Sequence, residues 1–269
     1  MSFDHGAGAQ QKHIARRRFG QNFLADPNII ARIVSAIRPQ PGETMVEIGP
    51  GLGALTAPLV ERLGHLDVIE IDRDLIARLR QQYAPARLTI HEGDALKFDF
   101  ATLTGEGASP PLRVVGNLPY NISTPLLFHL ADFAARIRDL TFMLQKEVVT
   151  RMVAVPGTAE YGRLSVMLQY RFRMERLFDV PPGAFRPAPK VTSSIVRMLP
   201  LPAEECGAKD EALLNRIVAA AFGQRRKTLK NTLREFLDET DFAALGLGSG
   251  LRGERLSVGD FVAIANYIC

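Results

Sequence analysis

The chain has 269 residues, of which 46% are hydrophobic and 23% are charged, a composition typical of a globular protein with a sizeable core. No apolar run approaches the about 18 residues of a membrane span, and the N-terminus lacks the apolar stretch of a secretory signal. The formal net charge of +4 is a weak indication of a polyanionic partner.

Cysteine and histidine are sparse and scattered. Cys206 and Cys269 lie far apart, and the five histidines show no metal-ligand spacing. This pattern predicts neither a disulfide framework nor a metal site. We therefore expect no metal and a reducing compartment, the cytoplasm.

From Thr44 onward, short β-rich runs alternate with helical stretches. Apolar periodicity and turn residues, such as Gly64 after the first helix of this series, set the boundaries. Near-continuous apolar strands separated by helices predict an α/β fold with a parallel sheet covered on both faces. We expect Ser123 or Thr124 to cap the third helix. The predicted strands are 44–49, 66–72, 87–95, 113–117 and 140–145, and the helices between them are 52–64, 73–84 and 123–137.

The regular alternation of strands and helices ends after Gln145. Helices are expected at 146–154 and 161–170, followed by strands at 171–180 and 193–200 that flank a Pro-rich loop. These two strands resemble a terminal hairpin, so we expect the last strands of the sheet to run antiparallel.

The last part of the chain reads as helical. The stretch "PLPAEECGAKD" is a linker, which places a domain boundary near Pro202 between residues 1–201 and 202–269. The pattern beyond it predicts helices at 210–223, 226–237, 241–245 and 257–268, the last one capped by Ser257.

The loop "EIGPGLGALT" joins the first strand of the sheet to its helix. Glycine lets the backbone turn sharply and approach a ligand, and a helix N-terminus favours negative groups. Because Gly49, Gly51 and Ala54 also satisfy the dinucleotide-binding pattern, the loop by itself fits NAD as well as S-adenosylmethionine (SAM).

Acidic residues end the next two strands. Glu70 lies 21 residues after Gly49, where a carboxylate can accept both ribose hydroxyls of NAD or SAM. Asp94, in "EGDAL", can accept from the exocyclic amine of the cofactor adenine. Ligands bind at this edge of an open α/β sheet, so the three elements together predict a nucleoside-containing cofactor.

The fourth strand ends in Asn117, Leu118, Pro119 and Tyr120. An aromatic amine such as adenine N6 is a poor nucleophile because its lone pair is delocalised into the ring. Acceptors on its hydrogens favour the tetrahedral nitrogen that attacks a methyl sulfonium, and the Asn117 side chain and the Leu118 carbonyl can supply them. Tyr120 can stack on a flipped base. This tetrapeptide indicates methyl transfer to adenine rather than hydride transfer.

These stretches resemble one family. "GQNFL", "EIGPGLGALT", "VIEID", "GDAL", "GNLPYNISTPLL", "LQKEV", "YGRLSV", "PPGAFRPAPKV" and "FGQRRKTLKN" are similar to the bacterial small-subunit (16S) rRNA adenine N6,N6-dimethyltransferases, whose loss gives kasugamycin resistance. The resemblance covers about residues 19 to 268. It implies a class I SAM-dependent methyltransferase fold, Rossmann-like with a seven-stranded sheet and an antiparallel last strand, plus a small helical C-terminal domain.

The resemblance also implies residue roles. The cofactor set would be Asn22, Leu24, Gly49, Glu70, Asp94 and Asn117, and the catalytic set would be Asn117, Leu118, Tyr120 and Phe185. Tyr120 and Phe185 would sandwich the target adenine, although Phe185 also fits a loop anchor in the core. The implied reaction dimethylates two adjacent adenosines near the 3′ end of 16S rRNA, on 30S subunits or their precursors late in assembly.

Basic residues gather in "FGQRRKTLKN", where Arg225, Arg226, Lys227 and Lys230 could contact RNA phosphates. We expect a monomer. Three alternatives stay open: an NAD-dependent dehydrogenase, a non-catalytic RNA-binding or assembly factor on the same fold, and the large-subunit rRNA adenine methyltransferases. The last two motifs of the chain favour the small-subunit enzymes.

Overall fold

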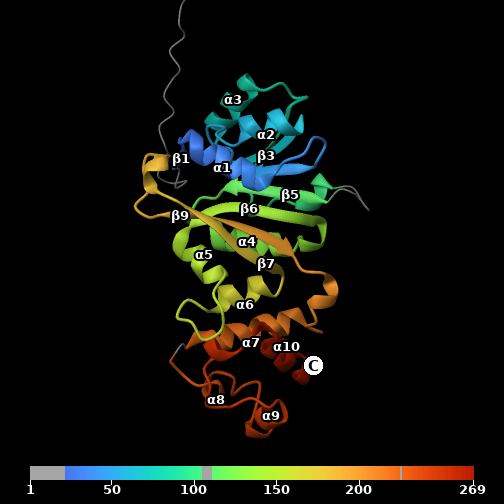
Figure 1. Ribbon diagram of the computed structural model, residues 1–269. Coiled ribbons are helices and arrows are strands. Elements are labelled where there is room, and N and C mark those ends of the chain that lie inside the picture. The colour runs from blue at the N-terminus through green and yellow to red at the C-terminus, as the bar shows by residue number, and fades with distance from the viewer. Residues whose placement is uncertain (1–21, 105–110, 225) are drawn as a thin grey trace, which may run out of the picture.

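A computed structural model describes residues 22–104, 111–224 and 226–269, and its centre is a seven-stranded sheet (Figure 1). The five strands at one side run parallel, whereas β9 (Ser193–Pro200) runs antiparallel to both of its neighbours, which confirms the predicted antiparallel ending. The strands in spatial order are β4 (Leu88–Glu92), β3 (Leu66–Glu70), β2 (Met45–Ile48), β5 (Leu112–Asn117), β6 (Ile137–Gln145), β9 and β7 (Phe172–Val180).

Helices cover both faces of the sheet, as the apolar strands predict. Alternate residues of one strand point to opposite faces, so Met45 packs in one core cluster and Val46 in another. The helices of the Met45 face are α1 (Pro27–Ile37), α2 (Thr56–Leu63) and α3 (Arg73–Gln82), and those of the Val46 face are α4 (Ser123–Ala131), α5 (Lys146–Met152) and α6 (Arg163–Gln169).

Helix α1 lies before Thr44, where the elements predicted from the sequence begin. The Asp26 side chain caps it by accepting from the amides of Asn28 (2.8 Å) and Ile29 (3.2 Å). Pro27 fits its first position, where no amide hydrogen is needed. Before it lies β1 (Phe23–Leu24), which pairs antiparallel with β8 (Phe185–Arg186) beside the main sheet.

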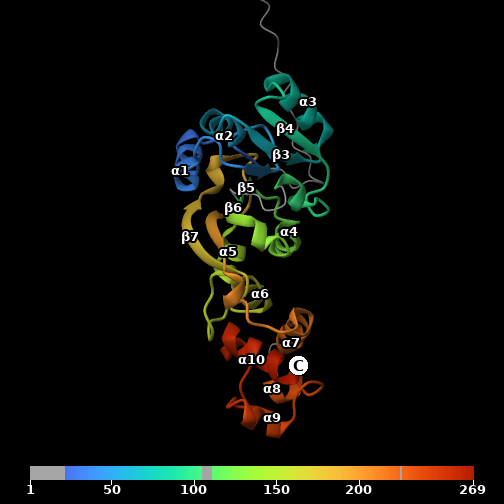
Figure 2. The same ribbon diagram turned by 90° about the vertical axis from the view of Figure 1, so that its right-hand side faces the viewer.

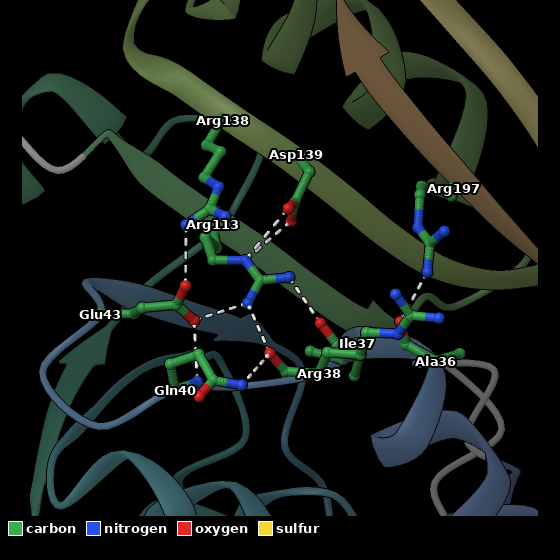
Figure 3. A network of polar contacts seen from close by, with 9 residues as sticks. All are labelled: Ala36, Ile37, Arg38, Gln40, Glu43, Arg113, Arg138, Asp139 and Arg197. Atoms are coloured by element: carbon green, nitrogen blue, oxygen red, sulfur yellow. Dashed lines mark hydrogen bonds and ion pairs between the residues drawn. The ribbon is translucent and has the colours of Figure 1, made fainter.

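Two arginines from the sheet hold the end of α1 (Figure 3). Arg113 Nη2 donates to the Ile37 carbonyl and Arg197 Nη2 to the Ala36 carbonyl, both at 2.6 Å. Helix ends leave such carbonyls without helical partners, so these bonds satisfy the helix and fix it on the sheet. Arg113 is itself held by Asp139 and Glu43.

Beyond β9, the described residues form helices that lie at the opposite end of the molecule from α2 and α3 (Figures 1 and 2). Their apolar side chains share a third cluster with Val166 and Tyr170, at α6 and its end. The Ser257 hydroxyl accepts from the Asp260 amide (3.1 Å), which confirms the predicted cap. These helices are α7 (Glu211–Gly223), α8 (Leu229–Thr232), α9 (Glu239–Ala244) and α10 (Val258–Ile268).

The prediction of one helix over 226–237 is wrong, because α8 has a single turn. A helix continuing from 226 would use the amides of Leu229 and Lys230 for its own carbonyls. Instead they donate to the carbonyls of Leu251 (2.7 Å) and Ser249 (3.0 Å). The tertiary contact with the 249–251 loop therefore starts the helix late.

Helix α4 is also shorter than the predicted 123–137. It ends at Ala131, and the Asp132 amide bonds back to the His129 carbonyl (3.2 Å) in a tighter turn. Neither Ser123 nor Thr124 caps it: the cap position is Ile122, and the Ser123 hydroxyl donates instead to the Tyr120 carbonyl (3.1 Å). The bond ties the helix start to the loop before it.

Candidate active site

A pocket opens at the carboxyl ends of β2, β3 and β5. The chain runs outward from β2 to β3 and β4 and then returns to the other side of β2 with β5, so the strand order reverses here. Such a reversal leaves a crevice between the diverging loops. All six residues of the predicted cofactor set and three of the four in the predicted catalytic set line the pocket: Asn22, Leu24, Gly49, Glu70, Asp94, Asn117, Leu118 and Tyr120.

Glycine allows close backbone approach at two points, one in the pocket lining and one on the neighbouring strand β5. Gly49 follows β2 with a φ of 68°, a conformation that costs glycine little and other residues more. At Gly116 on β5, an added Cβ would lie 2.6 Å from the Ile48 carbonyl oxygen, so a side chain there would push the two strands apart. The loop after β2 and the end of β5 can therefore meet closely.

Glu70 ends β3 with its carboxylate turned toward backbone amides. It accepts from Ile71 and Asp72, each at 2.9 Å, and from Gly51 at 3.4 Å. Burial raises the pKa of Glu70, although these amide bonds oppose the shift. A carboxylate has about four acceptor positions, which leaves room for a ligand hydroxyl.

Asp94 follows β4 and is half-buried. Its Oδ1 accepts from the Leu96 amide (3.0 Å), which fixes the side chain in the turn. Within the described ranges, no hydrogen bond involves its other carboxylate oxygen, so the group can accept from a donor in the pocket.

Asn117 ends β5 at the rim of the pocket. Its Nδ2 donates to the Asn22 carbonyl (3.1 Å), which orients the side-chain amide. With the nitrogen engaged, the amide oxygen is the group left to accept a hydrogen bond. The next residue, Leu118, buries its side chain, while its carbonyl has no intramolecular partner among the described residues.

Phe185 is not brought to this pocket. Its ring is fully buried in the core cluster of the α1 face, and its backbone pairs with Leu24 in the β1–β8 ladder. The arrangement fits the loop-anchor interpretation, and Phe185 is not among the residues that line the pocket beside Tyr120. Tyr120 does line the pocket and is half-buried.

The described part of the basic cluster spans α8 and the turn before it, at the opposite end of the molecule from α2 and α3 (Figure 1). Arg226 and Lys227 are exposed in the turn, and Lys230 pairs with Glu239 (2.7 Å) on α9. Arg225 lies outside the described residues. Lys230 is therefore partly neutralised, whereas Arg226 and Lys227 form no ion pair within the described residues.

Glu47 is a pocket residue that sequence reasoning missed. It lies inside β2, is 2% exposed, and accepts from the Thr56 hydroxyl (2.6 Å). Burial raises its pKa to about 7, against the effect of the Thr56 bond. The signal was present, since an acidic residue within the apolar run "TMVEIG" has to be buried with a partner.

The described ranges hold neither a metal-binding cluster nor a membrane-spanning helix. Residues 22–104, 111–224 and 226–269 contain no group of three or more His, Cys, Asp or Glu that could hold a metal ion. No helix in those ranges is long and apolar enough to cross a membrane.

Comparison with known proteins gives consistent matches. Residues 12–269 match the family described as "Ribosomal RNA adenine dimethylase". "Ribosomal RNA small subunit methyltransferase A" of Aromatoleum aromaticum is 80% identical over 257 residues, 96% of this chain and 95% of that relative. The protein of the same name from Thiobacillus denitrificans is 63% identical over 256 residues, 95% of this chain and 98% of that relative.

Solved structures support the fold. A dimethyladenosine transferase from Plasmodium falciparum has a TM-score of 0.77 at 24% identity and covers 90% of this chain and 95% of its own. The 23S rRNA methyltransferase ErmE has a TM-score of 0.66, also at 24% identity, and covers 92% of this chain and 99% of its own. The fold is thus that of class I methyltransferases, and because the family match extends through both the sheet and the C-terminal helices, the chain belongs to the ribosomal RNA adenine dimethylase family.

Proposed function

We propose that this protein transfers methyl groups from SAM to N6 of two adjacent adenosines near the 3′ end of 16S rRNA. The products are N6,N6-dimethyladenosines, made on small-subunit ribosomal particles late in assembly. The high identity to proteins called small subunit methyltransferases supports this substrate. The observation that carries the chemistry is the Asn117 amide, whose nitrogen is held by Asn22 so that its oxygen is left to accept.

The pocket offers hydrogen-bond acceptors that suit SAM. Gly49 gives close backbone approach, Glu70 has an acceptor position left for a ribose hydroxyl, and the second Asp94 oxygen can accept from an adenine amine. When bound, SAM supplies the electrophilic methyl group of its sulfonium. Asn22 and Leu24 would lie along its methionine end.

The chain's own groups act on the target amine. The Asn117 oxygen and the Leu118 carbonyl would accept the two N6 hydrogens and favour the tetrahedral nitrogen. Pro119 restricts the backbone at this turn, which keeps both acceptors in place. The methylated amine is acidic, so no strong base is needed. After the first transfer one hydrogen is replaced by methyl, so one acceptor loses its partner and the pocket has to hold the added group.

We also propose that the chain forms two domains with different roles. Residues 1–201 would form the catalytic domain, and residues 202–269 would form a helical domain that recognises RNA through Arg225, Arg226, Lys227 and Lys230. The protein would act as a monomer in the bacterial cytoplasm, where small-subunit particles are assembled.

Transfer of labelled methyl groups from SAM to undermethylated small ribosomal subunits, with mapping of the modified nucleotides, tests the proposal. We expect label at two adjacent adenosines of 16S rRNA. Asn117→Ala should slow both transfers about 100-fold, because it removes an acceptor that acts on the reacting nitrogen. Asn28→Ala, which removes an exposed amide on α1 outside the pocket lining, should change the rate little.

Other outcomes would point elsewhere. In a parallel reaction with large ribosomal subunits, label on 23S rRNA would favour a large-subunit enzyme. Binding of the particle without any transfer would favour a non-catalytic assembly factor, and binding of NADH but not SAM would favour a dehydrogenase. A normal rate of dimethylation by Asn117→Ala would remove that residue from the mechanism.

A further inference from the structure

We propose that Ser193 is a positioning residue for methyl transfer, which holds the Tyr120 ring at the rim of the pocket through a hydrogen bond between the two hydroxyls. The Tyr120 oxygen lies 2.7 Å from Ser193 Oγ, although the residues are 73 positions apart in the chain. This inference rests on the proposed function and on the prediction from the sequence that Tyr120 stacks on the target adenine.

Ser193 offers a fixed point. It is the first residue of β9 and is fully buried. Its backbone lies in register with Gln145 of β6 on one side and Val180 of β7 on the other. Because β9 is paired on both sides, the backbone of Ser193 has little freedom, and its buried hydroxyl stays in one place.

Tyr120 stands on a less constrained segment, the loop between β5 and α4. Its carbonyl accepts from the Ser123 hydroxyl (3.1 Å), which ties the backbone of Tyr120 to the start of α4. The Ser193 bond then fixes the far end of the ring. With both ends held, the ring cannot turn away from the pocket that it lines.

The hydroxyl of Tyr120 serves as a hydrogen-bonding group rather than as a base. Burial raises its pKa, although the Ser193 bond opposes the shift. The phenol therefore stays protonated at neutral pH. The value of the bond lies in orientation, because a ring that is already ordered loses less rotational freedom when a flipped base stacks on it.

Ser194 is a matched control. It is the next residue of β9 and is equally buried, but its hydroxyl donates to Asp179 Oδ1 (2.6 Å) instead of reaching Tyr120. Replacing either serine by alanine removes one buried hydroxyl from the same strand. The two variants differ in whether the tyrosine ring is released.

The test compares the variants Ser193→Ala, Ser194→Ala, Tyr120→Phe and the double variant Ser193→Ala/Tyr120→Phe. Their methyl transfer to undermethylated small ribosomal subunits is measured beside SAM affinity and thermal unfolding. Ser193→Ala should lower kcat/KM for the particle by about threefold to tenfold, the effect of ordering one side chain. SAM affinity should stay within about twofold, because the bond lies on the base side of the pocket.

Tyr120→Phe keeps the ring and removes the same bond, so it measures the effect even if Ser193→Ala folds poorly. It should lower kcat/KM by a similar factor, and the double variant should be no slower than the slower single variant, since all three lack one interaction. Ser194→Ala should keep the wild-type kcat/KM. Wild-type rates for Ser193→Ala and Tyr120→Phe, or additive losses in the double variant, would overturn the inference. Absence of transfer by the wild-type protein would instead overturn the proposed function.

Discussion

At the scale of single residues, Glu47 links the pocket to the stability of the fold. Its carboxyl is buried inside β2, and its pKa of about 7 lies above the ordinary value of 4.5. The folded protein therefore keeps the Glu47 proton up to a higher pH than the unfolded chain, which releases it near pH 4.5. The contribution of Glu47 to the free energy of unfolding should be greatest below pH 4.5, fall between pH 4.5 and about 7, and then level off.

Glu47→Gln should flatten this dependence, because the amide cannot ionise and still accepts from Thr56. Across that interval the wild-type protein should lose about 3 kcal/mol more than the variant, from a shift of between two and three pKa units. Urea unfolding at about pH 5 and about pH 8 measures the difference. Glu70, whose pKa is also raised, is present in both proteins, so the comparison contains only its charge repulsion with Glu47. Equal slopes for the two proteins would contradict the assignment to Glu47.

The sequence was enough to predict that the residues at the strand ends meet at one edge of the sheet. It was not enough to predict which distant side chains contact them. Glu70, Asp94 and Asn117 follow apolar runs, and a parallel sheet brings such ends to one edge. The bond between Tyr120 and Ser193 depends on where β9 inserts beside β6, which no local pattern encodes. The burial of Phe185 follows likewise from the pairing of two short strands that are far apart in sequence.

At the scale of elements, α1 depends on a buried ion network at the strand ends opposite the pocket (Figure 3). Arg113 Nε lies 3.0 Å from Asp139 and Nη1 lies 2.6 Å from Glu43, with all three side chains largely buried. Although burial opposes it, the Gln40 amide and the Arg113 guanidinium hold the pKa of Glu43 below its usual range. The network therefore favours the charged form of Glu43 at neutral pH.

Arg113→Met should lower the free energy of unfolding by about 3–5 kcal/mol, because it leaves two buried carboxylates and the end of α1 without their partner. Arg138→Met is the matched control, since Arg138 bonds the same Glu43 (2.8 Å) but is 52% exposed. Its loss should cost at most about 1 kcal/mol. The measurement is urea unfolding at neutral pH, and similar costs for both variants would show that the buried network contributes no more than a surface pair.

The local sequence contains the signals that form α1, but it does not contain the contacts that shorten α8. Asp26, Pro27 and the apolar spacing of Ile33, Val34 and Ile37 are a complete helix pattern, so the helix could have been predicted from the sequence. The late start of α8 depends on bonds to the carbonyls of Ser249 and Leu251, from a loop about 20 residues further along the chain. A helical sequence pattern does not form a helix where the amides of its first turn donate to carbonyls elsewhere in the fold.

At the scale of the whole molecule, the proposed boundary at residue 202 does not coincide with a break in the core. Val166 and Tyr170 precede it but share an apolar cluster with Leu214 and Phe261, which follow it. The Tyr170 hydroxyl also donates to the Cys206 carbonyl (2.8 Å). Because α6 belongs to this cluster and to the sheet core, it joins the helices to the sheet, and motion of the two parts as separate bodies would expose apolar surface.

The elongated shape separates the pocket from the proposed RNA-binding residues. The pocket is lined in part by residues at the starts of α2 and α3. The exposed Arg226 and Lys227 lie between α7 and α8, helices at the other end of the molecule (Figures 1 and 2). A ligand that reaches both ends has to be large, as a ribosomal particle is. Contacts to phosphate at the far end would give affinity and salt sensitivity, and the choice of adenosine would depend on the pocket.

Arg226→Glu/Lys227→Glu should therefore weaken binding to the small subunit and make it less sensitive to salt. Because this variant removes two cations that would neutralise phosphates, the slope of log affinity against log salt concentration should become shallower by about 1 to 2 units. Arg62→Glu/Arg73→Glu makes the same change in net charge on exposed residues of α2 and α3 and should leave the slope near its wild-type value. Titration of labelled particles at several salt concentrations separates the two. If both double variants reduce the slope equally, only net charge matters; if neither does, the cluster at the far end is merely solvated.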